Sequence, residues 1–89
     1  MEIIQEYLDI LNKEVSLSKE YAEKYMESKI RKDKKDKYFY QMAIESLSHS
    51  TKMHEFISDD IPKELLSQWE NAQEKYINKV SIVKRILLG

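Results

Sequence analysis

Apolar side chains recur over the first third of the chain in alternating steps of four and three residues, the spacing of a helical bundle seam. The members of this seam are Ile4, Leu8, Leu11, Val15, Ser18, Ala22 and Tyr25. A second stripe lies beside it and consists of Ile3, Tyr7, Ile10, Glu14, Leu17 and Tyr21. The pattern therefore predicts a long amphipathic helix over about residues 2–30.

The same periodicity returns between Tyr38 and Ile57, in a long apolar segment that holds both histidines. One stripe comprises Phe39, Met42, Ser46, His49, Met53 and Phe56, and its neighbour comprises Tyr40, Ala43, Leu47, Ser50, His54 and Ile57. This pattern predicts a second helix over about residues 36–57. Residues 31–37, RKDKKDK, carry no apolar side chain and predict a solvated turn. Because this connection is short, we expect the two helices to form an antiparallel hairpin.

A third helix is predicted over about residues 62–87, after a break at residues 58–62. Asp60 can cap this helix, and Pro62 suits its first turn, where no N–H is needed. Its last stretch, VSIVKRILLG, is apolar on more than one face, which predicts an interface with another copy. The predicted interface residues are Trp69, Tyr76, Val80, Val83, Ile86 and Leu87.

These elements predict an all-α fold in one domain over residues 1–89, a three-helix antiparallel up-down-up bundle. Dimerisation could complete it as a four-helix arrangement. One glycine and one proline leave little turn chemistry for a strand-rich architecture. The absence of cysteine excludes disulfides and thiolate metal sites and fits a cytoplasmic location.

Charge and hydropathy argue against two classes of partner. The net charge is -1 and acids and bases are interspersed, whereas nucleic acid binding needs a basic face. No run of eighteen apolar residues exists, and the N-terminus lacks the basic start and apolar run of a signal peptide. These features argue against a membrane span, although Lys79, Lys84 and Arg85 leave a membrane-surface role open.

Glu14 and His49 are the polar residues that carry candidate chemistry, because each lies within an apolar stripe. Glu14 either sits at the edge of the buried face and reaches water, or points inward and is neutralised by a metal or a base. With a turn near residue 34, Glu14 and His49 should lie at a similar height in the hairpin. Glu45 lies one turn before His49. Two carboxylates and an imidazole are suitable ligands for a divalent metal inside a bundle.

At these residues the chain resembles the ferritin-like superfamily, as a short or degenerate member of its rubrerythrin-like branch. The similar segments are EVSLSKEY, from Glu14 to Tyr21, and AIESLSH, which ends at His49. The resemblance covers about residues 8–57 and implies a four-helix bundle with a di-iron centre. It implies Glu14 and His49 as iron ligands, with Tyr21 beside them. The family's glutamate three residues before the histidine is replaced here by Ser46, so Glu45 would have to substitute.

Two functions follow from these observations. The first is a ferritin-like bundle that binds iron or another divalent metal through Glu14, Glu45 and His49, at a site shared between chains. The alternative is a metal-free helical scaffold or protein–protein interaction module that assembles through the third helix. Both predict a homo-oligomer, a dimer or higher. No nucleophile motif, glycine-rich phosphate loop or hydrolytic triad is visible in the sequence.

Overall fold

The computed structural model describes residues 2–89, which form helices joined by short connections. The elements are α1 (Glu2–Ile30), α2 (Asp36–Asp60), the 3-10 turn η1 (Lys63–Leu65), α3 (Leu66–Ala72) and α4 (Glu74–Leu88). No strand occurs among the described residues, so the all-α prediction is confirmed. The first helix has the predicted bounds, and the second continues to Asp60, beyond the predicted end at residue 57.

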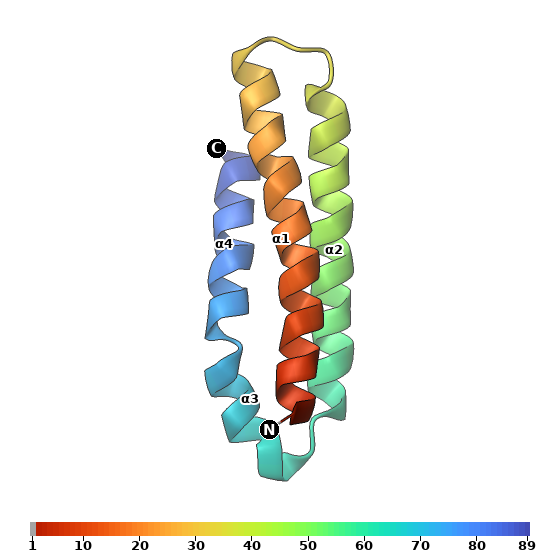
Figure 1. Cartoon of the computed structure of the whole chain (residues 1–89), viewed down its shortest axis with the longest axis vertical. Coiled ribbons are helices and arrows are strands. Elements are labelled where there is room, and N and C mark those ends of the chain that lie inside the picture. The colour runs from red at the N-terminus through yellow and green to blue at the C-terminus, as the bar shows by residue number, and fades with distance from the viewer. Residues whose placement is uncertain (1) are drawn as a thin grey trace.

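The helices make a narrow rod with principal extents of 51 × 18 × 17 Å. Figure 1 shows α1 between the other long helices, with α2 on one side and α4 on the other. The first two helices form the expected antiparallel hairpin, and α4 then runs back alongside α1 (Figure 1). The hairpin tip extends beyond the end of α4 (Figure 1).

The predicted seam of α1 lies inside the rod, where it packs between the other helices. Its buried members are Ile4, Leu8, Leu11, Val15, Ser18 and Ala22. Ala43, Leu47 and Ser50 are buried on α2, as are Tyr76, Val83 and Leu87 on α4. The core is therefore built from the stripes that the helical spacing identifies, because a helix with one apolar face gains most by burying it.

The third predicted helix is not continuous, and the prediction of one helix over residues 62–87 is wrong. The chain forms η1 and α3, interrupts the helix at Gln73, and resumes as α4. The interruption lies beside His54 of α2, whose Nε2 is 2.7 Å from Oε1 of Gln73. The imidazole stacks on Trp69 of α3 and Tyr76 of α4, with ring centroids 5.8 and 5.2 Å away. Both halves of the segment thus pack on one histidine.

The turn between α1 and α2 closes without glycine or proline. Lys32 has a positive φ of 58°, the left-handed conformation that usually follows the last turn of a helix. The N–H of Asp33 donates to the carbonyl of Ser28 at 2.8 Å, and the N–H of Lys32 donates to the carbonyl of Lys29 at 3.3 Å. These two bonds form a Schellman motif, which satisfies carbonyls at the end of α1. Residues 31–35 are exposed, as expected for a solvated turn.

The side chains predicted to form an interface on the third helix lie against the core of the same chain. Trp69, Tyr76, Val83 and Leu87 are buried, and Val80 and Ile86 are partly buried against the core. Little of their surface is left for another chain. Among residues 2–89, no helix combines the length and the apolar composition that crossing a membrane requires.

Candidate functional site

Glu14 and His49 meet on the side of the α1–α2 pair, although 35 positions separate them in the sequence. Oε1 of Glu14 lies 2.7 Å from Nδ1 of His49. The carboxylate side chain is 25% exposed and the imidazole 61% exposed. The pair therefore lies at the rim of the helix contact and faces solvent.

The position of Glu14 follows from its place on α1. It directly precedes Val15, which is fully buried, and a step of one residue turns the helix by about 100°. Glu14 therefore lies at the edge of the buried face, which is the first of the two positions that the sequence left open. A solvent-exposed carboxylate–imidazole contact of this kind contributes at most about 1 kcal/mol to stability.

Glu45 does not join this pair. Its side chain is exposed, and its Oε1 accepts a hydrogen bond from Nε2 of Gln41 at 3.1 Å. A separation of four residues turns Glu45 by about 40° relative to His49, away from the core. Among the described residues, no group of three or more His, Asp and Glu side chains could hold a metal ion. One chain thus brings together two of the three proposed ligands.

Tyr21 and Ser46 lie in the packed contact between α1 and α2. The Tyr21 ring stacks on Phe39 with centroids 6.5 Å apart, and Nζ of Lys24 lies 5.7 Å from the Tyr21 centroid. Tyr21 is two turns beyond Glu14, or about 10 Å along the helix axis. Ser46 is buried on α2. The contacts of Tyr21 are those of an aromatic packing residue near the hairpin tip.

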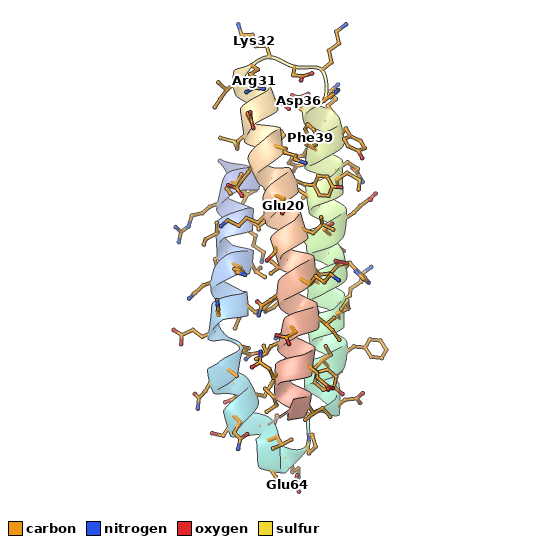
Figure 2. The ribbon with its side chains drawn as sticks, in the orientation of Figure 1. Glu20, Arg31, Lys32, Asp36, Phe39 and Glu64 are labelled. Atoms are coloured by element: carbon orange, nitrogen blue, oxygen red, sulfur yellow. The ribbon has the colours of Figure 1, made fainter. Side chains whose placement is uncertain are left out.

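A shallow hollow of about 610 Å³ lies next to the Glu14–His49 pair. Its walls come from α1 and α2 and consist of Ile10, Lys13, Glu14, Ser16, Leu17, Glu20, His49 and Met53. Figure 2 labels Glu20 on α1. The hollow is open to solvent and has an apolar floor with charged side chains around it, which suits a packed side chain better than a reacting substrate.

The apolar part of this face is an outer stripe of three aliphatic residues on α1, Ile3, Ile10 and Leu17. Their exposed fractions are 45%, 47% and 40%, and they follow one another at steps of seven residues. The sequence placed them on the second stripe of this helix but not among the interface residues. Their heptad spacing was the signal that could have identified them.

Charge is divided between the two ends of the rod. The contact between Glu14 and His49 shows that the middle of α1 lies level with the middle of α2. The hydrogen bond from Lys79 to Ser16 (3.2 Å) places the residues of α4 near Lys79 at the same level. The half with the hairpin tip, residues 17–47 and 80–89, has ten basic and six acidic side chains. The opposite half has five basic and ten acidic side chains. In Figure 2, Arg31 and Lys32 lie at the first end and Glu64 at the second.

The site thus combines an open carboxylate–imidazole pair with an uncovered apolar stripe beside it. The pair can accept or donate a hydrogen bond or supply two metal ligands, and the stripe can bury apolar surface. No family profile, curated protein or solved structure matches the chain.

Proposed function

We propose that this chain is a helical assembly module whose outer stripe on α1 docks a second copy of the same chain. The observation that carries the proposal is the heptad spacing of Ile3, Ile10 and Leu17, each at least 40% exposed. Exposed apolar residues on monomers are usually scattered singly. A heptad repeat instead keeps them on one side of the helix, where a second helix can cover them together.

The amount of exposed surface also favours association. The chain exposes 6428 Å², whereas a compact monomer of 10.7 kDa exposes about 5,500 Å². Its radius of gyration is 14.8 Å, compared with about 12 Å for a compact domain of this length. The excess surface is similar to the roughly 800 Å² that each partner buries in a standard protein interface. Covering one long side of the rod would remove it.

The proposed docking face is on α1 and not on the third predicted helix. Three aliphatic residues of α4, Ile77, Ile82 and Leu88, are as exposed as the outer stripe or more so. Ile82 points about 140° away from Ile77 and about 120° away from Leu88, and Ile77 and Leu88 are eleven residues apart, so the three do not form a continuous stripe. Two α1–α2 hairpins that face each other would form the four-helix arrangement expected from the sequence.

Native mass tests the proposal. Sedimentation equilibrium of the wild type should give a dimer at concentrations of about 100 μM or below. The double variant Ile10→Lys/Leu17→Lys should be monomeric with unchanged helicity by circular dichroism. The matched control Ile77→Lys/Ile82→Lys, on α4, should remain dimeric. A monomeric wild type, or a control that loses association as the stripe variant does, would overturn the proposal.

We propose metal binding as a second function, because Glu14 and His49 offer an adjacent carboxylate and imidazole. These ligand types suit iron, zinc or manganese, and the ferritin-like resemblance favours iron. One chain does not fit a di-iron centre, since no third described ligand joins the pair. The site would need the Glu14 and His49 side chains of two chains.

Metal content per chain tests this second function after anaerobic loading with ferrous iron. About one or two irons per dimer are expected, with loss of the metal in Glu14→Ala and in His49→Ala. Glu45→Ala is the matched control, because this carboxylate lies outside the pair. Metal content that is the same in all four proteins would exclude the site without affecting the assembly proposal.

A further inference from the structure

We infer that the two copies pair antiparallel, about a two-fold axis level with Leu17, so that Lys13 of each copy faces Glu20 of the other. This inference rests on the proposed assembly function and specifies its geometry. It makes Lys13 and Glu20 the residues that determine orientation and register.

The division of charge along the rod favours the antiparallel orientation. In a parallel pair, the half with ten basic and six acidic residues would lie against its own copy, and the acidic half against its own copy. An antiparallel pair places each basic half beside an acidic half. Opposite charges attract over distances comparable to the Debye length, about 8 Å at physiological salt, so neighbouring rods experience this difference.

The flanks of the outer stripe lead to the same orientation. Glu6, Lys13 and Glu20 are exposed and follow one side of the stripe at steps of seven residues. The other side of the stripe carries Tyr7, Glu14 and Tyr21, and Glu14 there already contacts His49. In a parallel pair the charged flank would face that other side, whereas in an antiparallel pair it faces its own copy. In the antiparallel pair Lys13 therefore meets Glu20, whereas in a parallel pair it would meet the side that carries Glu14, whose carboxylate already contacts His49.

The register follows from charge pairing and from overlap. With the axis level with Leu17, each Lys13 lies within about 1.5 Å of the level of Glu20 in the other copy, and the rods overlap along their full length. Moving the axis by half a heptad places Lys13 opposite Lys13 and Glu6 opposite Glu20, which are like charges. Moving it by a whole heptad pairs Glu6 with Lys13 but shifts the rods by about 21 Å, at 1.5 Å per residue, along their 51 Å length. Full overlap with opposite charges paired selects the first register.

Lys13 and Glu20 are available for this contact. Among residues 3–89, the salt-bridge contacts within the chain are Arg31–Glu27 and, when the imidazole is protonated, His49–Glu14, and neither involves these two side chains. They are seven residues apart on α1, which is too far for a contact with each other along the helix. If a substitution of Glu20 restores the association lost on substitution of Lys13, the two side chains must therefore interact between copies.

A charge swap tests the contact. Lys13→Glu and Glu20→Lys should each weaken the dimer by about tenfold, because each removes two opposite-charge contacts and creates like-charge ones. The combined Lys13→Glu/Glu20→Lys variant should recover wild-type association, because both contacts form again with reversed sign. The inference would be contradicted if the combined variant lost as much dimer affinity as the two single variants lose together.

Disulfide trapping tests the orientation without relying on charge, and the chain has no cysteine to interfere. Leu17→Cys should cross-link into a covalent dimer, since a disulfide needs Cα atoms within about 7 Å. The two copies of Ile3 would lie about 40 Å apart and those of Ile10 about 20 Å apart, so Ile3→Cys and Ile10→Cys should remain uncross-linked.

The outcomes separate this inference from the assembly proposal. A dimer in which Ile3→Cys and Leu17→Cys cross-link equally is parallel, which overturns the inference and preserves assembly. A dimer that cross-links only through Ile10→Cys has its two-fold axis one heptad away, level with Ile10, and this result also overturns the inference. A wild type that stays monomeric overturns both.

Discussion

The hydroxyl of Ser18 donates a hydrogen bond to the carbonyl oxygen of Ala43 over 2.7 Å, and both residues are fully buried. The bond joins α1 to the backbone of α2 at a distance of 25 residues in sequence. Ala22, one turn further along α1, is also fully buried. Small side chains at this contact let the two helices approach closely.

Substitutions at Ser18 test this close approach. Ser18→Ala should lower the free energy of unfolding by about 1 kcal/mol, because it removes one hydrogen bond and leaves the packing intact. Ser18→Leu should cost about 1–3 kcal/mol more, because the added methylenes force the helices apart. Urea denaturation measures both values. A leucine variant as stable as the alanine variant would show that the contact is loosely packed.

The Glu14–His49 contact at the candidate site should contribute little to folding. A double-mutant cycle with Glu14→Gln and His49→Gln should give a coupling of no more than about 1 kcal/mol, because solvent screens a pair whose imidazole is 61% exposed. The cycle is measured by chemical denaturation at neutral pH and low salt. A coupling free energy above this value would mean that a second chain covers the pair and shields it from solvent.

Replacing Lys32 should stabilise the protein. Lys32 has a left-handed backbone conformation with φ 58°, which is unfavourable for a residue with a Cβ atom. Lys32→Gly removes this atom and should raise the free energy of unfolding by about 0.5–1 kcal/mol. Lys34→Gly, in the same exposed turn but without positive φ, is the matched control. We expect the control to leave stability unchanged or to lower it, as seen by thermal or urea denaturation.

Tyr76 should make stability depend on pH in alkaline solution. Burial raises the pKa of its phenol above the ordinary value of 10.0, and the hydrogen bond to Ser50 partly offsets this rise. A raised pKa in the folded state means that stability is complete below the unfolded pKa and is lost as pH rises through the folded pKa.

Comparison with Tyr76→Phe isolates this dependence, because lysines also titrate in the same range. Above about pH 10, the free energy of unfolding of the wild type should fall more steeply than that of the variant. Equal slopes for the two proteins would show that the phenol does not remain protonated in the folded state.

Local periodicity was sufficient to predict α1 and most of its core. Ile4, Leu11 and Ala22 are buried because an apolar stripe at helical spacing has one stable location, against other helices. The start of α2 and the solvated turn were predictable for the same reason. The spacing of Glu14 and His49 also led to the expectation that they lie at one height, and the structure brings them within 2.7 Å.

Features that depend on tertiary contacts could not be predicted in this way. The interruption at Gln73 arises where one histidine packs on both Trp69 and Tyr76, and no local residue marks it. The left-handed Lys32 stands where glycine would have signalled the helix end. Periodicity also shows that Leu17 lies on an apolar stripe, but not whether another helix covers that stripe.

The central place of α1 has a consequence for how the protein is made. This helix emerges from the ribosome before α2 and α4, and it contacts both of them. Until the segment around Ala43 has been synthesised, the seam lacks the helix that covers it in the folded chain, and α4 follows later still. Newly made chains therefore expose apolar surface on both sides of α1 during translation, which makes them prone to premature association with one another and to capture by chaperones.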